Sequence, residues 1–362
     1  MRRLSQLLPF LLFVASALIA TSCATSFSDR ASDILEPYRL PDAPGGAVLV
    51  VDRDSILVRD AFGFADVEAR VPNAPATNFR LASVTKQFTA MCVLILRDRS
   101  LLHLDDAITD FFPEGPPIWR SITVRHLLTH SSGLVDYEDV MAESTIVPLL
   151  DRDVLRLARS VDTTYFVPGS RYQYSNTGYA LLALIVERTS GLTFASFLRK
   201  EIFEPTGMSG TVAFENGIST VERRAFGYTP TSEGSPRFDR TDQSMTSSVL
   251  GDGGIYSSVI DLLQWHRSLL TATLVRRPTL EEAFAPHIVS PDSTVRYGYG
   301  WMIGEMEGWK VLSHSGSTIG FRNFILRIPE RKMVVIVLMN RANGDAEHLA
   351  RSLAAECLRR KE

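Results

Sequence analysis

Two residues early in the chain, Ser83 and Lys86, have a spacing that suits nucleophilic chemistry. The run QFTAMCVLIL follows at residues 87–96, and a segment this apolar on all sides predicts a buried helix. At about 3.6 residues per turn, Ser83 and Lys86 lie on nearly one face of its first turn. A lysine amine kept neutral there takes the proton of the serine hydroxyl, which makes the oxygen a nucleophile.

A second motif is Tyr174-Ser175-Asn176. Residues two apart in an extended stretch point to the same side, so Tyr174 and Asn176 both face one cleft. A tyrosine beside a lysine cation acts as a phenolate base and then as the acid for the leaving group. The alternative is an ordinary half-buried aromatic followed by an asparagine that caps the next helix.

The third motif is His314-Ser315-Gly316-Ser317, at the end of an expected strand. Gly316 lets another backbone approach closely, and an edge strand there pairs with a peptide-like substrate while a backbone N–H completes an oxyanion hole. Taken alone, His314 also fits a structural, hydrogen-bonded histidine.

Together and in this order, the three motifs resemble those of the serine β-lactamase and penicillin-binding-protein superfamily. The Tyr-x-Asn form is similar to the class C branch, which includes class C β-lactamases, D-alanyl-D-alanine carboxypeptidases, D-aminopeptidases and esterases. Framework segments at residues 122–134, 253–257 and 299–301 support the resemblance.

The resemblance implies a role for each motif residue. The catalytic residues would be Ser83, Lys86 and Tyr174. The substrate-binding residues would be Asn176, His314, Ser315, Gly316 and Ser317. Ser83 would be the acylated nucleophile, and the backbone N–H groups of Ser83 and Ser317 would form the oxyanion hole.

His314 departs from the class C β-lactamases, which usually carry lysine at this position. Histidine is mostly neutral at pH 7 and is similar to the carboxypeptidase and esterase members. Arg322, a few residues on, is an alternative source of positive charge. We therefore expect a serine hydrolase that forms an acyl-enzyme from a D-Ala-D-Ala-type peptide or small ester. The alternatives are a class C-like β-lactamase and an inactive peptide- or glycan-binding pseudoenzyme.

Cofactors and other partner classes have little support in the sequence. His126 and His130 are spaced for a metal pair, but no acidic partner with ligand spacing stands out, so we expect neither metal nor cofactor. No Lys/Arg run indicates nucleic acid, which leaves a small molecule or a peptide, including a cell-wall peptide, as the expected partner.

Residues 1–23 resemble a lipoprotein signal peptide. Arg2 and Arg3 precede an apolar stretch at residues 7–20, and small residues lead to Cys23, the expected lipidation site. A cleaved secretory signal is the alternative. Without this segment, which carries two arginines and no acid, the formal charge of −3 becomes −5. Either route predicts export to the periplasm or cell envelope. Of the other two cysteines, both Cys92 and Cys357 are expected to be buried.

The order of elements predicts an α/β (α+β) fold of the β-lactamase/transpeptidase type. Strands are expected at residues 46–51, 56–64, 309–313, 324–328 and 334–339, and a helix at 345–359. We therefore expect an antiparallel sheet flanked by helices in residues 24–100 and 250–362, which carry Ser83, Lys86 and His314. An all-helical insert at residues 101–249 would carry Tyr174 and Asn176, with a ligand cleft at the junction.

Overall fold

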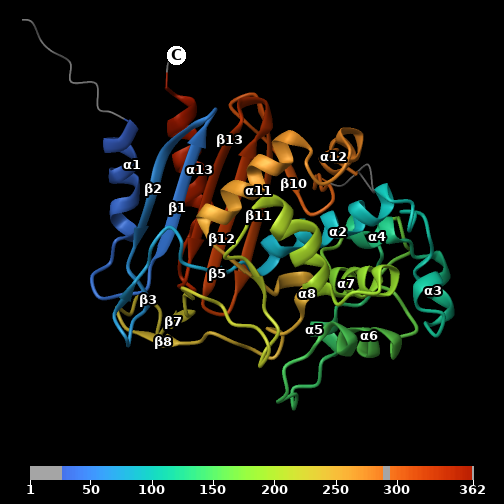
Figure 1. Ribbon diagram of the computed structural model, residues 1–362. Helices are drawn as coiled ribbons and strands as arrows, with labels where there is room; N and C mark the ends of the chain where they lie inside the picture. Colours follow the sequence, from blue (N-terminus) through green and yellow to red (C-terminus); the bar gives the residue numbers. More distant parts are fainter. Residues whose placement is uncertain (1–26, 288–293, 361–362) are drawn as a thin grey trace, which may run out of the picture.

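The computed structural model describes residues 27–287 and 294–360, so the expected signal peptide and Cys23 lie outside it. Its main element is a six-stranded antiparallel sheet with the order β10-β11-β12-β13-β1-β2 (Figure 1). The strands are β1 (Gly46–Asp52), β2 (Ser55–Phe62), β10 (Met302–Met306), β11 (Trp309–Thr318), β12 (Phe321–Ile328) and β13 (Met333–Met339). The predicted sheet, built from both ends of the chain, is confirmed.

Helices cover both faces of this sheet, and strand β1 shows why. Alternate residues of a strand point to opposite faces. Val48 and Val50 pack with α1 (Phe27–Leu35) and α13 (Ala346–Leu358). Ala47 and Leu49 belong to the larger core, which includes residues of α2 (Lys86–Asp98) and α11 (Val259–Thr271). All seven residues of β1 are therefore buried.

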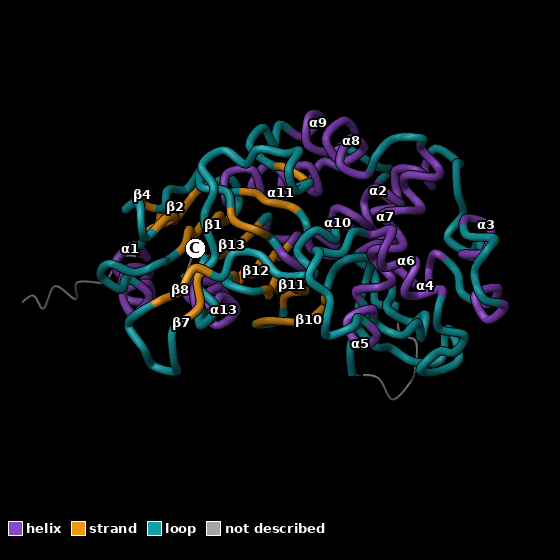
Figure 2. Tube along the Cα trace, turned by 90° about the horizontal axis from the view of Figure 1, so that it is seen from below, coloured by secondary structure: helices purple, strands orange, loops and turns teal. Residues whose placement is uncertain are grey.

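A second group of helices lies beside the sheet (Figure 2). It consists of α3 (Ile108–Phe111), α4 (Val124–Leu128), α5 (Tyr137–Val140), α6 (Asp151–Arg159), α7 (Asn176–Ser190), α8 (Phe194–Leu198) and α9 (Glu204–Thr206). The remaining helices are α10 (Leu250–Gly253) and α12 (Arg277–Ala283). Short helical turns are η1 (Glu36–Tyr38), η2 (Ala82–Thr85), η3 (Pro117–Ser121), η4 (Arg199–Phe203) and η5 (Pro329–Arg331). Helix α7 packs on α2, α6 and α10.

The expectation that residues 101–249 are all helical holds only as far as Thr206. Beyond it, β6 (Val212–Ala213) pairs with β9 (Ile255–Ser257), which also pairs with β5 (Phe79–Arg80). Two further ribbons are β3 (Phe64–Asp66) with β4 (Val71–Pro72) and β7 (Tyr228–Pro230) with β8 (Phe238–Arg240). Strands of two or three residues are too short to show an alternating pattern, which is why the sequence does not predict them.

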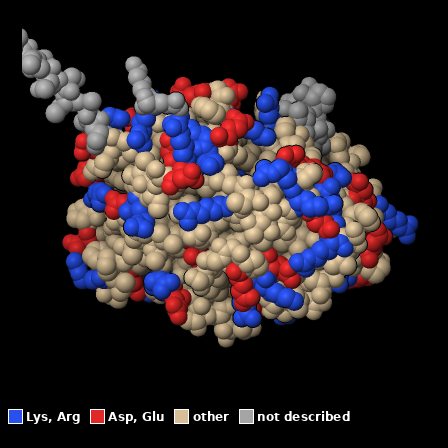
Figure 3. Space-filling model, turned by 45° about the horizontal axis from the view of Figure 1, so that its top comes forward, with Lys and Arg blue, Asp and Glu red and all other residues tan. Residues whose placement is uncertain are grey.

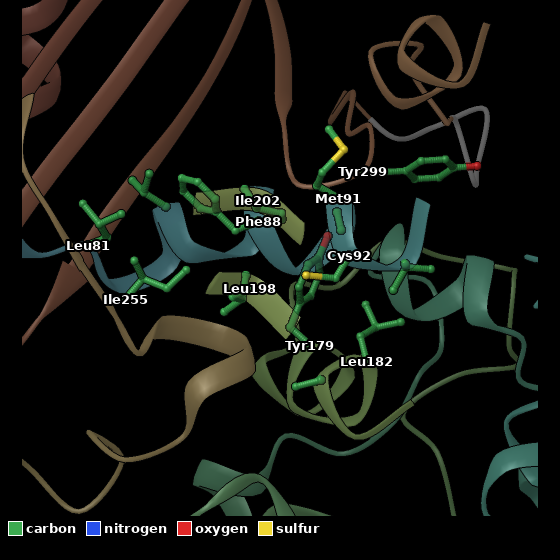
Figure 4. Packing of buried hydrophobic residues seen from close by; sticks show 14 of the residues in the cluster. Leu81, Phe88, Met91, Cys92, Tyr179, Leu182, Leu198, Ile202, Ile255 and Tyr299 are labelled. Atoms are coloured by element: carbon green, nitrogen blue, oxygen red, sulfur yellow. The ribbon is translucent and has the colours of Figure 1, made fainter. Parts of the chain in front are cut away.

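Helix α2 lies between the sheet and α7, and residues 86–96 are all buried. Phe88 stacks on Trp265 of α11 with ring centroids 4.4 Å apart. Figure 4 shows Met91 and Cys92 of α2 above Tyr179 and Leu182 of α7. Cys92 and Cys357 are both buried, as expected. Among the described residues no single helix is long and apolar enough to cross a membrane, although the bent pair Asn176–Ser190 and Phe194–Thr206 together meets that length and composition.

Candidate active site

Ser83 lies on the turn η2 that leads into α2, and not on the first turn of the α-helix as predicted, because α2 begins only at Lys86. Ala82, directly before it, has φ of +50°, a left-handed conformation that costs free energy in a residue other than glycine. Ala82 is buried and Ser83 is half-buried. On this strained turn, the Ser83 side chain is therefore partly exposed beside the buried core.

Lys86 is fully buried and joins three parts of the chain through its amine. Nζ lies 3.1 Å from Ser83 Oγ, 2.8 Å from Asn176 Oδ1 and 3.0 Å from the carbonyl oxygen of Asp252. An ammonium donates to all three acceptors. A neutral amine donates to Asn176 and Asp252 and keeps a lone pair for the Ser83 proton. The predicted nucleophile and base are thus in direct contact.

Tyr174 and Asn176 reach the same place from the segment before α7. Lys86 Nζ lies 4.8 Å from the centre of the Tyr174 ring, a cation–π distance. The buried Tyr174 hydroxyl has no hydrogen-bond partner among the described residues. Asn176 begins α7; its backbone N–H donates to Asp136 Oδ2 (2.6 Å), and its side-chain amide donates to Glu138 Oε1 (3.1 Å). The Tyr174 hydroxyl is therefore not held by a hydrogen bond to any other described residue.

The third motif lies in the C-terminal half of β11, which continues to Thr318, five residues beyond the predicted end of the strand. Gly316 contacts the turn before Ser83, because a Cβ added to it would come within 2.1 Å of the Leu81 carbonyl oxygen. Ser315 and Ser317 alternate with the buried His314 and Gly316 and are exposed. The structure thus brings the three motifs together, since Lys86 bonds to Asn176 and the ring centroids of Tyr174 and His314 are 6.2 Å apart, although His314 itself is buried.

Hydrogen bonds fix the tautomer of the neutral His314 imidazole. Nδ1 donates to the Ser315 carbonyl oxygen (2.7 Å), so Nε2 accepts the hydroxyl proton of Tyr297 (3.0 Å). Burial lowers the pKa of His314 to about 4. Arg322, the alternative cation, donates through Nη1 to the carbonyl oxygens of Thr318 and Phe321, which ties its guanidinium to its own hairpin and leaves the charge in place.

The two spaced histidines each accept a hydrogen bond from the backbone. His126 Nδ1 accepts the backbone N–H of Thr123 (3.2 Å), and His130 Nδ1 accepts that of Ser175 (3.1 Å). Within residues 27–287 and 294–360, no three His, Cys, Asp or Glu side chains are grouped to hold a metal ion. Both histidines instead organise backbone next to the cleft.

A protein-family model described as "Beta-lactamase" matches residues 37–358, which is most of the chain. The chain belongs to this beta-lactamase family. Its intact Ser83–Lys86 pair and its relatives make this family member a serine hydrolase.

Similar proteins agree with the family assignment. The chain is 30% identical over 330 residues to penicillin-binding protein 4* of Bacillus subtilis (strain 168), covering 86% of this chain and 71% of that protein. It is 33% identical over 348 residues to a D-aminopeptidase of Gluconobacter oxydans (strain 621H), covering 91% of this chain but 62% of the relative. Among solved structures, the octameric penicillin-binding protein homologue from Pyrococcus abyssi has a TM-score of 0.80 at 28% identity, covering 92% and 76% of the two chains.

Sequence reasoning missed three contributors to the site of this family member. Asp252 supplies a backbone oxygen, and its buried carboxyl, whose pKa burial raises to about 6, accepts the Tyr137 hydroxyl. Glu138 contacts Asn176, and Tyr297 holds His314. Of these three, only Asp252 was indicated by the sequence, because it lies in the glycine-rich stretch GDGG, which is typical of close backbone packing.

Proposed function

We propose that the chain hydrolyses amides and short peptides of D-amino acids that carry a free amino group, through an acyl-enzyme on Ser83. The observation that supports this substrate class is the charge of the cleft. Carboxylates lie next to Asn176, and the buried His314, at the position where class C β-lactamases carry lysine, is neutral. The D configuration is taken from the D-aminopeptidase relatives.

The acidic wall favours a substrate with a positive charge. Glu138 accepts from the Asn176 amide, while both Asp136 oxygens accept backbone N–H groups. In the described part of the chain, no lysine or arginine forms an ion pair with either carboxylate. Partial removal from water and the Asp136 charge raise the pKa of Glu138. A substrate ammonium at Asn176 would relieve this repulsion.

His314 offers no positive charge to a substrate carboxylate. A penicillin or a peptide with a free C-terminus presents such a group, which a cation would recognise. His314 is neutral at pH 7, and Arg322 is bound to its own hairpin. The neutral His314, at the position where class C β-lactamases usually carry lysine, disfavours the β-lactamase alternative.

The proposed reaction has two steps. In the first, Ser83 Oγ attacks the amide carbonyl while Lys86 and Tyr174 take up the hydroxyl proton, and the backbone N–H groups of Ser83 and Ser317 hold the oxyanion. The C–N bond breaks as Tyr174 passes a proton to the leaving amine. In the second step, water cleaves the ester, which releases the D-amino acid and restores the hydroxyl of Ser83.

The decisive experiment compares three substrates: D-alanine p-nitroanilide, its N-acetyl derivative and an N-acylated D-Ala-D-Ala peptide. We expect kcat/KM for the free amine to exceed that of the other two by at least about tenfold, equivalent to about 1.4 kcal/mol. Ser83→Ala should lower turnover by several orders of magnitude. Preference for the N-acylated peptide would reinstate the carboxypeptidase reading.

Glu138→Gln tests the amine site directly. It should lower kcat/KM for the free amine by about tenfold and leave hydrolysis of p-nitrophenyl acetate, which has no amine, within about twofold. Asp139→Asn is the matched control, since Asp139 is the next residue and its carboxylate accepts from Tyr165 rather than Asn176. Equal losses on both substrates would argue against amine recognition by Glu138.

A further inference from the structure

We infer that His130 is a positioning residue, which holds the Tyr174 phenol in place for proton transfer through its own backbone and imidazole. This inference rests on the proposed role of Tyr174. His130 lies just beyond α4, far from the three motifs in sequence, and it is 1% exposed.

Hydrogen bonds to this one histidine hold the backbone on both sides of Tyr174. The N–H of Gln173 donates to the carbonyl oxygen of His130 (2.9 Å). The N–H of Ser175 donates to the imidazole Nδ1 of His130 (3.1 Å). Residues 173 and 175 are therefore both tied to His130, and the backbone of Tyr174 has little freedom to shift.

The imidazole also contacts the phenol ring itself. The ring centroids of His130 and Tyr174 are 4.2 Å apart at 31°. Three further tyrosines surround the imidazole, with centroid distances of 4.7 Å for Tyr297, 5.0 Å for Tyr179 and 5.9 Å for Tyr172. This aromatic enclosure fixes the imidazole plane and, through it, the orientation of the Tyr174 ring.

The contact to Ser175 requires one protonation state. Nδ1 accepts a hydrogen bond only when it carries no proton, so the proton is on Nε2 and the ring is neutral. Burial and the Lys86 cation keep the pKa of His130 well below its usual range. Its backbone φ of +55° is tolerated better by histidine and asparagine than by most other residues.

Two substitutions distinguish the contribution of the Nδ1 acceptor of His130 from that of its aromatic ring. His130→Phe keeps a ring and removes the acceptor, whereas His130→Asn keeps an acceptor oxygen close to the position of Nδ1 and suits the positive φ. We expect His130→Phe to lower kcat for D-alanine p-nitroanilide by about 100-fold, as for a displaced catalytic group, with little change in KM. His130→Asn should recover at least about tenfold of that loss.

A double-mutant cycle with Tyr174→Phe tests whether His130 acts through Tyr174. If it does, His130→Phe should cost little in a chain that already lacks the phenol, so the two losses do not add. Additive losses, or equal losses in His130→Asn and His130→Phe, would overturn the inference. A thermal melt of each variant identifies any that fail to fold.

A measurement that needs no substrate tests the role of His130 independently of the substrate proposal. The cycle is repeated with the rate at which a fluorophosphonate labels Ser83, with Ser83→Ala as the blank. If wild type is labelled but does not cleave the anilide, the substrate proposal fails, and non-additive labelling rates still support the role of His130. If His130→Phe does not fold, His130→Gln replaces it, because its longer side chain does not place the oxygen at the position of Nδ1.

Discussion

At the scale of single residues, the amine of Lys86 is where separate parts of the chain meet. It bonds to Ser83 within its own segment, to Asn176 at the start of α7 and to the backbone of Asp252 in α10. The sequence could predict the first two contacts, because serine, lysine and asparagine carry functional side chains. It could not predict the third, because a backbone carbonyl has no residue-type signature.

The neutral state of His314 leads to a pH-dependent stability. Its pKa is about 4 in the folded chain and about 6.5 when unfolded, so the unfolded state binds the proton first as the pH falls. The stability that His314 contributes is therefore present above about pH 6.5 and is lost as the pH falls through about 4. Relative to His314→Gln, wild type should lose about 3 kcal/mol of unfolding free energy between pH 7 and pH 4.

Urea denaturation at several pH values measures this difference. Comparing the two chains at each pH matters, because Asp151 and Asp252 have pKa values raised to about 7 and 6 by burial and act in the opposite direction. His348→Gln, the same substitution at an exposed histidine of α13, serves as the control. A difference that stays constant from pH 7 to pH 4 would show that His314 also titrates normally in the folded chain.

At the scale of elements, β11 lies directly against the segment that carries Ser83. Gly316 has no room for a side chain, since a Cβ would come within 2.1 Å of the Leu81 carbonyl oxygen. Gly316→Ala must therefore push β11 away from the turn that carries Ser83. We expect a loss of about 1–3 kcal/mol in stability, as for overpacking, and about 100-fold in kcat/KM.

Gly304→Ala in β10 is the matched control for this change. It alters the same residue type in the adjacent strand, where nothing lies within 4 Å of the added Cβ. Urea denaturation and anilide hydrolysis should leave this control close to wild type. If Gly316→Ala were equally harmless, the close approach of β11 to Leu81 would not matter for the cleft.

Helices and strands could be predicted from the sequence where their run of apolar residues was long. The seven apolar residues of β13 and the apolar run of α2 predict a buried strand and a buried helix without ambiguity. Strand β10, MIGEM, is an edge strand with two exposed polar or small residues and lacks such a pattern. The 3-10 turn η2 was also missed, because its strain at Ala82 depends on the surrounding packing.

At the scale of the whole molecule, the N-terminal helix and the candidate site lie on opposite sides of the sheet. Helix α1 packs with α13 against one face, whereas α2 packs against the other. Figure 1 places α1 at the far end of the sheet from the helices around α7. On the face shown in Figure 3, acidic and basic side chains are interspersed, which does not suggest a charged surface for docking there.

This separation bears on the expected lipid anchor. If Cys23 is lipidated, Cys23→Ser should move the protein from the membrane fraction to the soluble fraction, as judged by fractionation and radiolabelled palmitate. Its kcat/KM should stay within about twofold of wild type, since α1 is remote from Ser83. Ser22→Ala is the control, and palmitate incorporation into Cys23→Ser would contradict lipidation at this cysteine.

The position of β1 in the sheet also determines when its two neighbouring strands become available during synthesis. β1 pairs on one side with β2, its neighbour in sequence, and on the other with β13, the last strand to be synthesised. At about 5–20 residues per second, the β1–β2 hairpin waits roughly 15–60 s for that partner. Throughout this interval the apolar edge of β1 is open to pairing with other nascent chains, so β1 is prone to aggregation until β13 has been made.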